Sequence, residues 1–595
     1  MIQKISFFFL ALPTLLFAQN GTWQQAVDYT IDLTIQEDLH RAKGVEKLIY
    51  TNESPDTLKE LYFHLYWNAF QRGSHYFDKK GSYFNETLSN EDFGKIEIVS
   101  IKVDGVPLTI NIFESIGQVK LPKYLPPKCN TNITIEFSSQ IPSCIERAGK
   151  NNTSGTDYTF TQWYPKICRY DHMGWHTDPY YGREFAGVFG TYNVSIACAS
   201  DFVVAGTGNL TNKKYTAKGW ADIEKSGKDN EQEKGITTWR FHAENVHDFA
   251  FAMDKEWLHK ELQIDDIAFH FFYNKKYQDD WKALMEKWPK SYAICKEEFG
   301  IYPYDQFSFI QGGEGYMEYP NCTMLESSRS DFYNTACHEF MHNYFYGIFG
   351  TNENLHHWMD EGLTCYAEAR ISNVGKEKEN YAETANKTYL SYASFVQEEP
   401  ISTAANHFTG DYAYYIGAYF KGQLFPELIR YIIGDQNMRK GFESYYHKWK
   451  FKHPEPNDFV KSFEDQTLME LSWFQNYWLN TVQQIEFSID TVQQKDSHVE
   501  ILLSKNGIPM PVEIAVEYKS GKIAYYHVPL DLTNNVKSDF DRETTVLEKW
   551  SSASRDYTFI LPNKKISEIK SILVDPDKFL PETNRKNNKW TYKKK

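Results

Sequence analysis

The sequence lacks the features of membrane-spanning and nucleic-acid-binding proteins. Beyond the first twenty residues no stretch approaches eighteen consecutive apolar residues, so no transmembrane helix is predicted in the mature chain. There is no excess of positive charge either, because the formal net charge is −15 and a nucleic-acid partner needs a basic face. An internal repeat and a low-complexity tract are also missing. The 595 residues therefore predict a large globular protein with room for three or four domains.

Cysteine is sparse and shows no pattern. The eight cysteines include no C-x-x-C pair and no zinc-finger spacing. A chain of this size does not need disulfides for stability, so we assign no bridge. Cys337 and Cys365 lie within predicted helices, where a small apolar packing role is the simplest interpretation. We assign no cysteine as a metal ligand.

The first eighteen residues have the pattern of an export signal. Lys4 supplies a basic start, residues 5–17 are largely apolar but too few to span a bilayer, and Leu16-Phe17-Ala18 offers a cleavage site before Gln19. A retained anchor is the alternative, although Pro13 interrupts the apolar run and no lipidation cysteine follows. We therefore expect an exported protein, periplasmic or extracellular.

A candidate metal site lies in the sequence His338-Glu339-Phe340-Met341-His342. On a helix the two histidines stand one turn apart on the same face, where both imidazoles can bind one metal ion, and Glu339 lies beside them. A zinc hydrolase also needs a third protein ligand and an open position for water. Glu361 can supply that ligand, nineteen residues after His342 in a segment that reads as the opening of a second helix. Glu368 shares a face with Glu361 and could orient a ligand histidine.

These residues resemble the motifs of the gluzincin zinc aminopeptidases, the family of aminopeptidase N and the leukotriene hydrolase. HEFMH, eighteen residues and then Glu361 have the spacing of that family. Upstream, Gly315-Tyr316-Met317-Glu318-Tyr319 resembles its G-x-M-E-N exopeptidase signature, with Tyr319 in place of the asparagine. Downstream, Tyr419-Phe420-Lys421-Gly422 resembles its Y-x-K-G motif. The motifs occur in the family's order, and the resemblance covers nearly the whole mature chain.

The resemblance implies a cofactor and catalytic roles. It implies one zinc ion per chain, held by His338, His342 and Glu361, which would activate water and polarise the scissile carbonyl. Glu339 would be the general base, and Tyr419 would donate a hydrogen bond to the oxyanion.

The resemblance also implies how the substrate binds. Glu318 would pair with the ammonium group of the peptide's first residue and so impose exopeptidase register. Gly315 and Met317 precede this glutamate and are also expected to bind substrate, and so is Gln162, which lies in a segment similar to a loop that borders the substrate in relatives. Tyr164 occupies a place where some relatives carry an acidic residue, which would leave Glu318 as the main amine anchor.

The predicted fold is multidomain α+β. Alternating apolar and polar runs such as 44–50, 95–101 and 132–137 indicate strands, and Asp104-Gly105 indicates a hairpin. From about residue 255 the pattern is largely helical, with one strand-like interlude at 306–325, and from about residue 484 strands return. We thus predict a signal peptide and, by resemblance, an N-terminal β saddle domain, a thermolysin-like and mainly helical zinc domain, a C-terminal β-sandwich and a polar tail, at residues 1–18, 19–254, 255–482, 483–582 and 583–595.

The predicted function is an exported zinc aminopeptidase that acts on peptides. One alternative is an endopeptidase with the same zinc chemistry, which would be favoured if Glu318 did not face the cleft. The other is a binding protein on a retired protease fold, although such proteins usually lose a ligand or the base and here all are present. No sequence feature specifies an oligomeric state.

Overall fold

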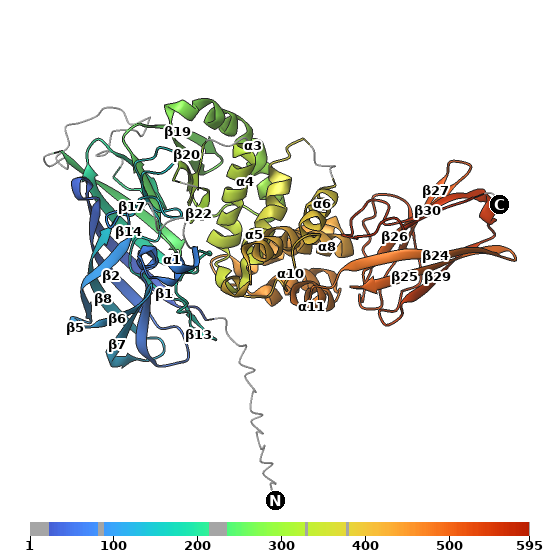
Figure 1. Ribbon diagram of the computed structural model, residues 1–595, viewed down its shortest axis with the longest axis horizontal. Coiled ribbons are helices and arrows are strands. Elements are labelled where there is room, and N and C mark those ends of the chain that lie inside the picture. The colour runs from blue at the N-terminus through green and yellow to red at the C-terminus, as the bar shows by residue number, and fades with distance from the viewer. Residues whose placement is uncertain are drawn as a thin grey trace, which may run out of the picture.

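The computed structural model describes residues 23–80, 89–212, 235–313, 315–327, 331–375 and 380–593. Along the longest axis a β-rich N-terminal region, a central helical region and a second β region follow one another (Figure 1). This order confirms the predicted fold class. The predicted signal peptide lies outside the described residues, and the exact domain boundaries stay predictions. None of the helices in the described ranges is both long enough and apolar enough to span a bilayer.

The N-terminal region is built on an eight-stranded sheet with two smaller sheets packed against it. Residues of β1 and β2 alternate strictly between buried and exposed, so one face of the large sheet covers the core. Asp104 and Gly105 both have positive φ and join β4 to β5 in the predicted hairpin. The large sheet has the order β16 (Asn209–Leu210), β17 (Ile236–Val246), β14 (Gly190–Ala199), β1 (Ala26–Gln36), β2 (Arg41–Thr51), β8 (Asn130–Gln140), β4 (Lys95–Val103) and β5 (Val106–Leu108).

The smaller sheets of this region have four, four and two strands. One has the order β15 (Val203–Gly206), β18 (Phe251–Asp254), β10 (Tyr158–Phe160) and β9 (Gly149–Lys150). Another has the order β11 (Lys166–Ile167), β3 (Leu58–His64), β7 (Ile116–Leu125) and β6 (Ile110–Phe113), and β12 (Tyr170–Asp171) pairs with β13 (Gly174–Trp175).

The central region begins with strands, which corrects the prediction of a largely helical pattern from residue 255. Its five-stranded sheet has the order β19 (Trp257–Ile264), β20 (Ile267–Asn274), β21 (Gln306–Gln311), β23 (Cys322–Leu325) and β22 (Met317–Tyr319). β19 and β20 escaped prediction because β20 is buried on both faces and so shows no polar alternation.

Nine α-helices follow in the described part of the central region. All of them except α7 (Asp411–Tyr415) share one large apolar core with one face of the five-stranded sheet. They are α3 (Gln278–Phe299), α4 (Phe332–His342), α5 (Glu353–Ile371), α6 (Tyr381–Ala393), α7 (Asp411–Tyr415), α8 (Gly422–Ile433), α9 (Asp435–Trp449), α10 (Pro456–Thr467) and α11 (Ser472–Asn480), and the π-helical segments η5 (Asn343–Ile348) and η7 (Ile416–Lys421) extend α4 and precede α8.

The C-terminal region consists of a three-stranded and a five-stranded sheet. The strands are β24 (Ile485–Lys495), β25 (His498–Gly507) and β29 (Asp556–Pro562) in one, and β28 (Thr544–Val546), β27 (Ile523–Val528), β26 (Val512–Tyr518), β30 (Ile569–Val574) and β31 (Lys589–Thr591) in the other. β31 corrects the prediction of a polar tail from residue 583, because it pairs with β30 and Asn588 before it is buried.

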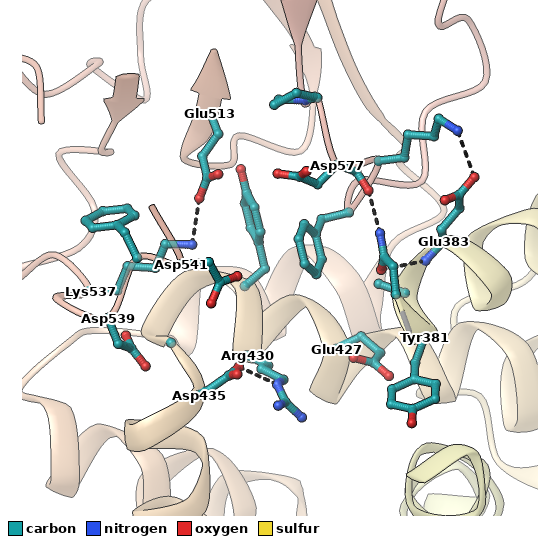
Figure 2. A pocket seen from close by; sticks show the side chains of 18 of the residues that line it. Tyr381, Glu383, Glu427, Arg430, Asp435, Glu513, Lys537, Asp539, Asp541 and Asp577 are labelled. Carbon is teal, nitrogen blue, oxygen red and sulfur yellow. Dashed lines mark hydrogen bonds and ion pairs between the residues drawn. The ribbon is translucent and has the colours of Figure 1, made fainter. Parts of the chain in front are cut away.

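A cavity of about 700 Å³ lies between α6, α8 and the C-terminal sheets (Figure 2). Its walls are strongly charged, and the basic side chains that line it have acidic partners. These pairs are Arg370 with Glu427, Arg430 with Asp435, Lys537 with Glu513, Arg542 with Asp577, and Lys578 with Glu383. The cavity is thus a polar part of the interface between two regions, and none of the predicted site residues lines it.

Candidate metal centre and active site

The HExxH motif occupies the C-terminal end of α4, beneath the five-stranded sheet. His342 is the last α-helical residue, and η5 continues the helix at the wider π pitch. Asn343 begins that segment, and its side-chain oxygen accepts the backbone N–H of Asn321 at 2.8 Å. This bond links the end of α4 to the turn between β22 and β23. The motif is therefore anchored to the sheet as well as to its own helix.

Three candidate ligand atoms converge between α4 and α5. The Nε2 atoms of His338 and His342 are 3.0 Å apart, and Glu361 Oε2 lies 3.3 Å and 3.4 Å from them. Glu361 comes from the middle of α5, which packs against α4. Zinc bonds of 2.0–2.1 Å in a tetrahedral site place ligand atoms about 3.3 Å apart. Two imidazoles and one carboxylate at these distances fit a zinc ion with one position left open.

The far nitrogen of each histidine contacts a carboxylate. Glu368 Oε2 lies 3.2 Å from His338 Nδ1, in the place that the helical spacing predicts. Asp360 Oδ1 lies 2.5 Å from His342 Nδ1, and Thr364 Oγ1 is 3.3 Å from the same nitrogen. Such contacts orient the rings and present Nε2 to the metal. Asp360 was not among the predicted site residues, although it directly precedes Glu361.

Glu339 has the surroundings of a general base. Its side chain is buried, and Oε2 has no hydrogen-bond partner among the described residues. Burial raises the pKa of Glu339 to about 7, while the nearby His338 and His342 act in the opposite direction. A carboxylate poised near neutral pH can accept a proton and release it again.

Tyr419 reaches the metal ligands from η7. Its hydroxyl donates a hydrogen bond to Glu361 Oε1. Burial raises the pKa of Tyr419 well above its usual value, and the charge of Glu361 adds to this effect, so the hydroxyl stays protonated and remains a donor. Close packing holds the two residues together. A Cβ on Gly362 would lie 2.6 Å from the Cα of Gly422, so only glycine allows α5 to approach the start of α8.

Glu318 belongs to a cluster of carboxylates. It lies on the edge strand β22, is buried, and its Oε1 has no hydrogen-bond partner among the described residues. Glu184 and Glu353 each offer an oxygen within 4.8 Å of it. Burial raises the pKa of Glu318 and of Glu353 well above the usual range. Carboxylates crowded in this way favour a cationic group among them.

This cluster changes the expectation that Glu318 would be the main acidic anchor. Glu184 comes from the irregular segment before β14 and Glu353 from the first turn of α5, so no local motif reveals either of them. Arg147 pairs with Glu184 through both guanidinium NH groups, at 2.9 Å and 3.2 Å. Tyr164 lies elsewhere, because it is fully buried and donates a hydrogen bond to Asp248 at 3.0 Å.

The other predicted substrate-binding residues lie around β22. Tyr319 donates a hydrogen bond to Gln162 Oε1 at 3.2 Å, which brings the loop of Gln162 next to the strand. Gly315 has φ of +75°, a conformation that glycine adopts without strain. The side chain of Met317 is buried in the core of the N-terminal region. Met317 can therefore meet a ligand in the cleft through its backbone only.

A comparison with protein families matches residues 270–478 to the peptidase family M1 domain, and the match includes all three candidate ligands. The chain carries a peptidase family M1 domain. This confirms the family indicated by the motifs and the prediction of a peptidase. The M1 domain starts within β20 and ends within α11, so it spans most of the central region.

Known proteins are similar to this chain in sequence or in fold. "Probable aminopeptidase 2" of Sulfurisphaera tokodaii is 22% identical over 318 residues, which is 51% of this chain and 36% of that protein. The matched part thus spans about a third of that relative's length. An M1 zinc metallopeptidase of Deinococcus radiodurans, in a substituted form, has a TM-score of 0.54 at 13% identity, covering 77% of this chain and 94% of that one.

Two other solved structures contain bound amino acids. A two-domain M1 zinc metallopeptidase bound to L-tryptophan has a TM-score of 0.55 at 14% identity, with 77% and 95% coverage. Legionella pneumophila aminopeptidase A in complex with aspartic acid has a TM-score of 0.63 at 11% identity, covering 94% of this chain and 59% of that chain. These similarities establish the fold around the M1 domain.

Proposed function

We propose that the protein is an exported zinc aminopeptidase that removes N-terminal residues from peptides. The observation that carries this proposal is the short distance between two sites. A trio that fits zinc lies beside a buried cluster of carboxylates, and His342 links them, because its ligand atoms lie within 4.8 Å of both Glu318 and Glu361. A peptide whose free ammonium group enters the carboxylate cluster has its first peptide bond near the zinc ligands.

The residues of the site would divide the chemistry as follows. His338, His342 and Glu361 would hold a zinc ion, which polarises the scissile carbonyl and makes water a better nucleophile. Glu339 accepts the proton of the attacking water and delivers it to the leaving amine. Tyr419 donates its hydroxyl hydrogen to the carbonyl oxygen as negative charge develops there, and in the free enzyme that hydrogen bond goes to Glu361.

Substrate register would come from the carboxylates of Glu318, Glu184 and Glu353. A charge-assisted hydrogen bond between an ammonium group and a carboxylate is stronger than a neutral one, and here it forms in a buried place. An acetylated N-terminus has no charge to offer and would leave Glu318 Oε1, which has no hydrogen-bond partner among the described residues, without one. The similar M1 structures described with single amino acids bound support this proposal, because an amino acid is the product of such a cleavage.

Hydrolysis of a peptide panel tests the proposal. Each peptide is supplied with a free and with an acetylated N-terminus and is incubated with wild type, Glu318→Gln, Glu339→Gln and the control Glu297→Gln, which changes an exposed carboxylate on α3. We expect cleavage of free-amine peptides only. It should be lost in Glu339→Gln, weakened through a higher KM in Glu318→Gln, and unchanged in the control. Equal cleavage of the acetylated peptides would contradict the aminopeptidase proposal and favour an endopeptidase.

The proposal of export rests on the pattern of the first eighteen residues. With a cleavage site after Ala18, the mature protein begins at Gln19. N-terminal sequencing of protein recovered from the periplasm or the medium should find this residue first. A mature protein that still carries Met1 in the cytoplasm would refute export and leave the peptidase proposal unaffected.

A further inference from the structure

A second group of two histidines and one carboxylate lies on the five-stranded sheet, at the edge opposite Glu318. It consists of His259 and Glu261 on β19 and His270 on β20. β19 and β22 are the two opposite edges of the five-stranded sheet, so this group and Glu318 belong to different ends of it. None of the three residues takes part in the active site described above.

The strand register explains why these side chains meet. His259 and Glu261 are two residues apart on β19 and therefore point to the same face of the sheet. Glu261 pairs directly with His270 across the antiparallel ladder, and His259 pairs with Phe272, two residues further along β20. Residues paired across neighbouring strands, and their diagonal neighbours, are within side-chain reach. The hairpin thus presents three potential ligands side by side.

The group resembles the zinc-ligand trio of the same chain in composition and spacing. His259 Nε2 and His270 Nδ1 are 3.0 Å apart, the same distance as between the two catalytic imidazoles. Glu261 Oε2 lies 3.6 Å from His270 Nδ1, and all three ligand atoms are within 4.8 Å of one another. Two imidazoles and a carboxylate form a donor set that suits zinc.

Its surroundings are those of a structural site between two regions. The side chains of His259 and His270 are buried, while that of Glu261 is 36% exposed, so a cation and its hydration water can enter from one side. The His259 ring stacks on Phe272 at 4.6 Å, and Phe272 and Trp257 belong to the core of the N-terminal region. The opposite face of β20, with Phe269 and Phe271, belongs to the core of the helices.

We propose that His259, Glu261 and His270 form a second divalent-metal site, with zinc as the preferred ion and water as the remaining ligand. A hydrogen bond between the imidazoles also explains their spacing, and the Glu261 carboxylate beside them adds the negative charge and the third donor atom that a divalent cation needs. A cation between the three atoms would bond to all of them. The bound ion would hold the edge hairpin of the catalytic sheet in the shape that packs on the N-terminal region.

Metal content of the full chain tests this site independently of peptidase activity. Wild type, His270→Gln, the double variant His338→Gln/His342→Gln and the triple variant are equilibrated with zinc, freed of loose metal by gel filtration, and analysed by mass spectrometry for zinc per chain. We expect two zinc ions per chain in wild type, one in His270→Gln, one in the double variant and none in the triple variant. His242→Gln is the matched control, because it removes an exposed histidine next to a carboxylate, and it should keep two.

A second measurement keeps the test valid if His270→Gln does not fold. In the double variant, which lacks the catalytic trio, Glu261→Gln changes only a partly exposed carboxylate and should weaken zinc binding about tenfold or more in competition with a chelator. Zinc should also raise the melting temperature of the double variant. One zinc in wild type with none in the double variant, or no effect of Glu261→Gln on zinc affinity, would overturn the second site.

Discussion

The carboxylate behind His342 shows how much a single residue outside the metal ligands contributes. Asp360 is fully buried and contacts His342 Nδ1, and its own Oδ2 has no hydrogen-bond partner among the described residues. The contact fixes the ring so that Nε2 points at Glu361 and the metal position. Asp360 therefore belongs to the function of the site although it does not reach the metal.

We expect Asp360→Asn to lower the affinity of the catalytic site for zinc by about 10–100-fold, because the amide is a weaker partner for the imidazole. The measurement is the zinc concentration that half restores peptidase activity to chelator-stripped enzyme. This readout reports the catalytic site alone, even if zinc binds elsewhere. Asp435→Asn, which changes an exposed carboxylate on α9, is the control. Equal zinc requirements of Asp360→Asn and wild type would show that the contact is dispensable.

At the residue scale, the local spacing of the sequence predicted some residues of the site and could not predict others. His338, His342, Glu361 and Glu368 lie on two helices, where the helical period alone places side chains on a common face. Glu184 comes from an irregular segment more than a hundred residues before Glu318, and only the packing of the N-terminal region on the M1 domain brings it there. No periodicity encodes a contact of that kind.

Among the elements, the contact of α5 with η7 and α8 is the one that assembles the site. Gly362 directly follows the ligand Glu361, and Gly422 closes the Y-x-K-G motif three residues after Tyr419. A Cβ on Gly362 would meet backbone atoms of Gly422 at 2.5 Å and 2.6 Å. The two glycines thus allow the close approach that lets Tyr419 reach Glu361.

Gly362→Ala should force α5 away from α8 and cost about 1–3 kcal/mol of the free energy of unfolding, as overpacking does. The same displacement should move Tyr419 away from Glu361 and from the position of the scissile carbonyl, which lowers kcat. Urea denaturation and steady-state kinetics measure both effects. Gly347→Ala in η5 is the matched control, since its Cβ would find only an ordinary contact with Asn343 at 3.5 Å. If Gly362→Ala is as stable and active as wild type, the close approach has no role.

Element prediction succeeded where one face of a strand or helix is exposed. Apolar residues repeat at helical spacing over 278–299, which are the bounds of α3. β20 was missed because both of its faces are buried, and β31 was missed because it is short and has lysines around it. Asn506-Gly507 is a dipeptide typical of tight turns, but both residues still pair with β24 at the end of β25.

For the whole molecule, His247 is a main contact between the N-terminal region and the M1 domain. It follows β17, its Nε2 lies 2.9 Å from the carbonyl oxygen of Tyr346 in η5, and its ring meets that of Tyr346 edge-on at 4.4 Å. Burial lowers the pKa of His247 to about 4, and the charge of Lys166 adds to this effect. The folded protein therefore keeps this imidazole neutral at pH values where the unfolded chain protonates it.

The lowered pKa of His247 makes the folded protein less stable as the pH falls. The contribution of His247 is complete above pH 6.5 and is lost as the pH falls toward 4, at a slope of about 1.4 kcal/mol per pH unit. His247→Gln retains a donor for the Tyr346 carbonyl but cannot titrate, so its unfolding free energy should fall less steeply in this window. Urea denaturation between pH 4.5 and 7.5 measures the slope, with the exposed His242→Gln as control. Identical slopes for His247→Gln and wild type would refute this assignment.

The order of regions along the molecule was predictable because strand and helix periods alternate in long blocks. How the regions touch was not, because contacts such as those of His247 and Glu184 join residues from distant blocks. The site could still be predicted, because the motifs of the M1 domain identify its residues without knowledge of these contacts.

If the protein is the aminopeptidase proposed above, the edge position of β22 would define which chains it processes. An edge strand can pair its backbone with an extended peptide, and backbone is common to every sequence. Glu318 on that strand would then require only a free amine. Each cleavage would expose a new one, so a shortened peptide would again be a substrate. A protein whose first residues are built into a folded domain could not extend along β22 and would be spared. Such an enzyme would work downstream of other proteases, reducing loose peptide ends to amino acids.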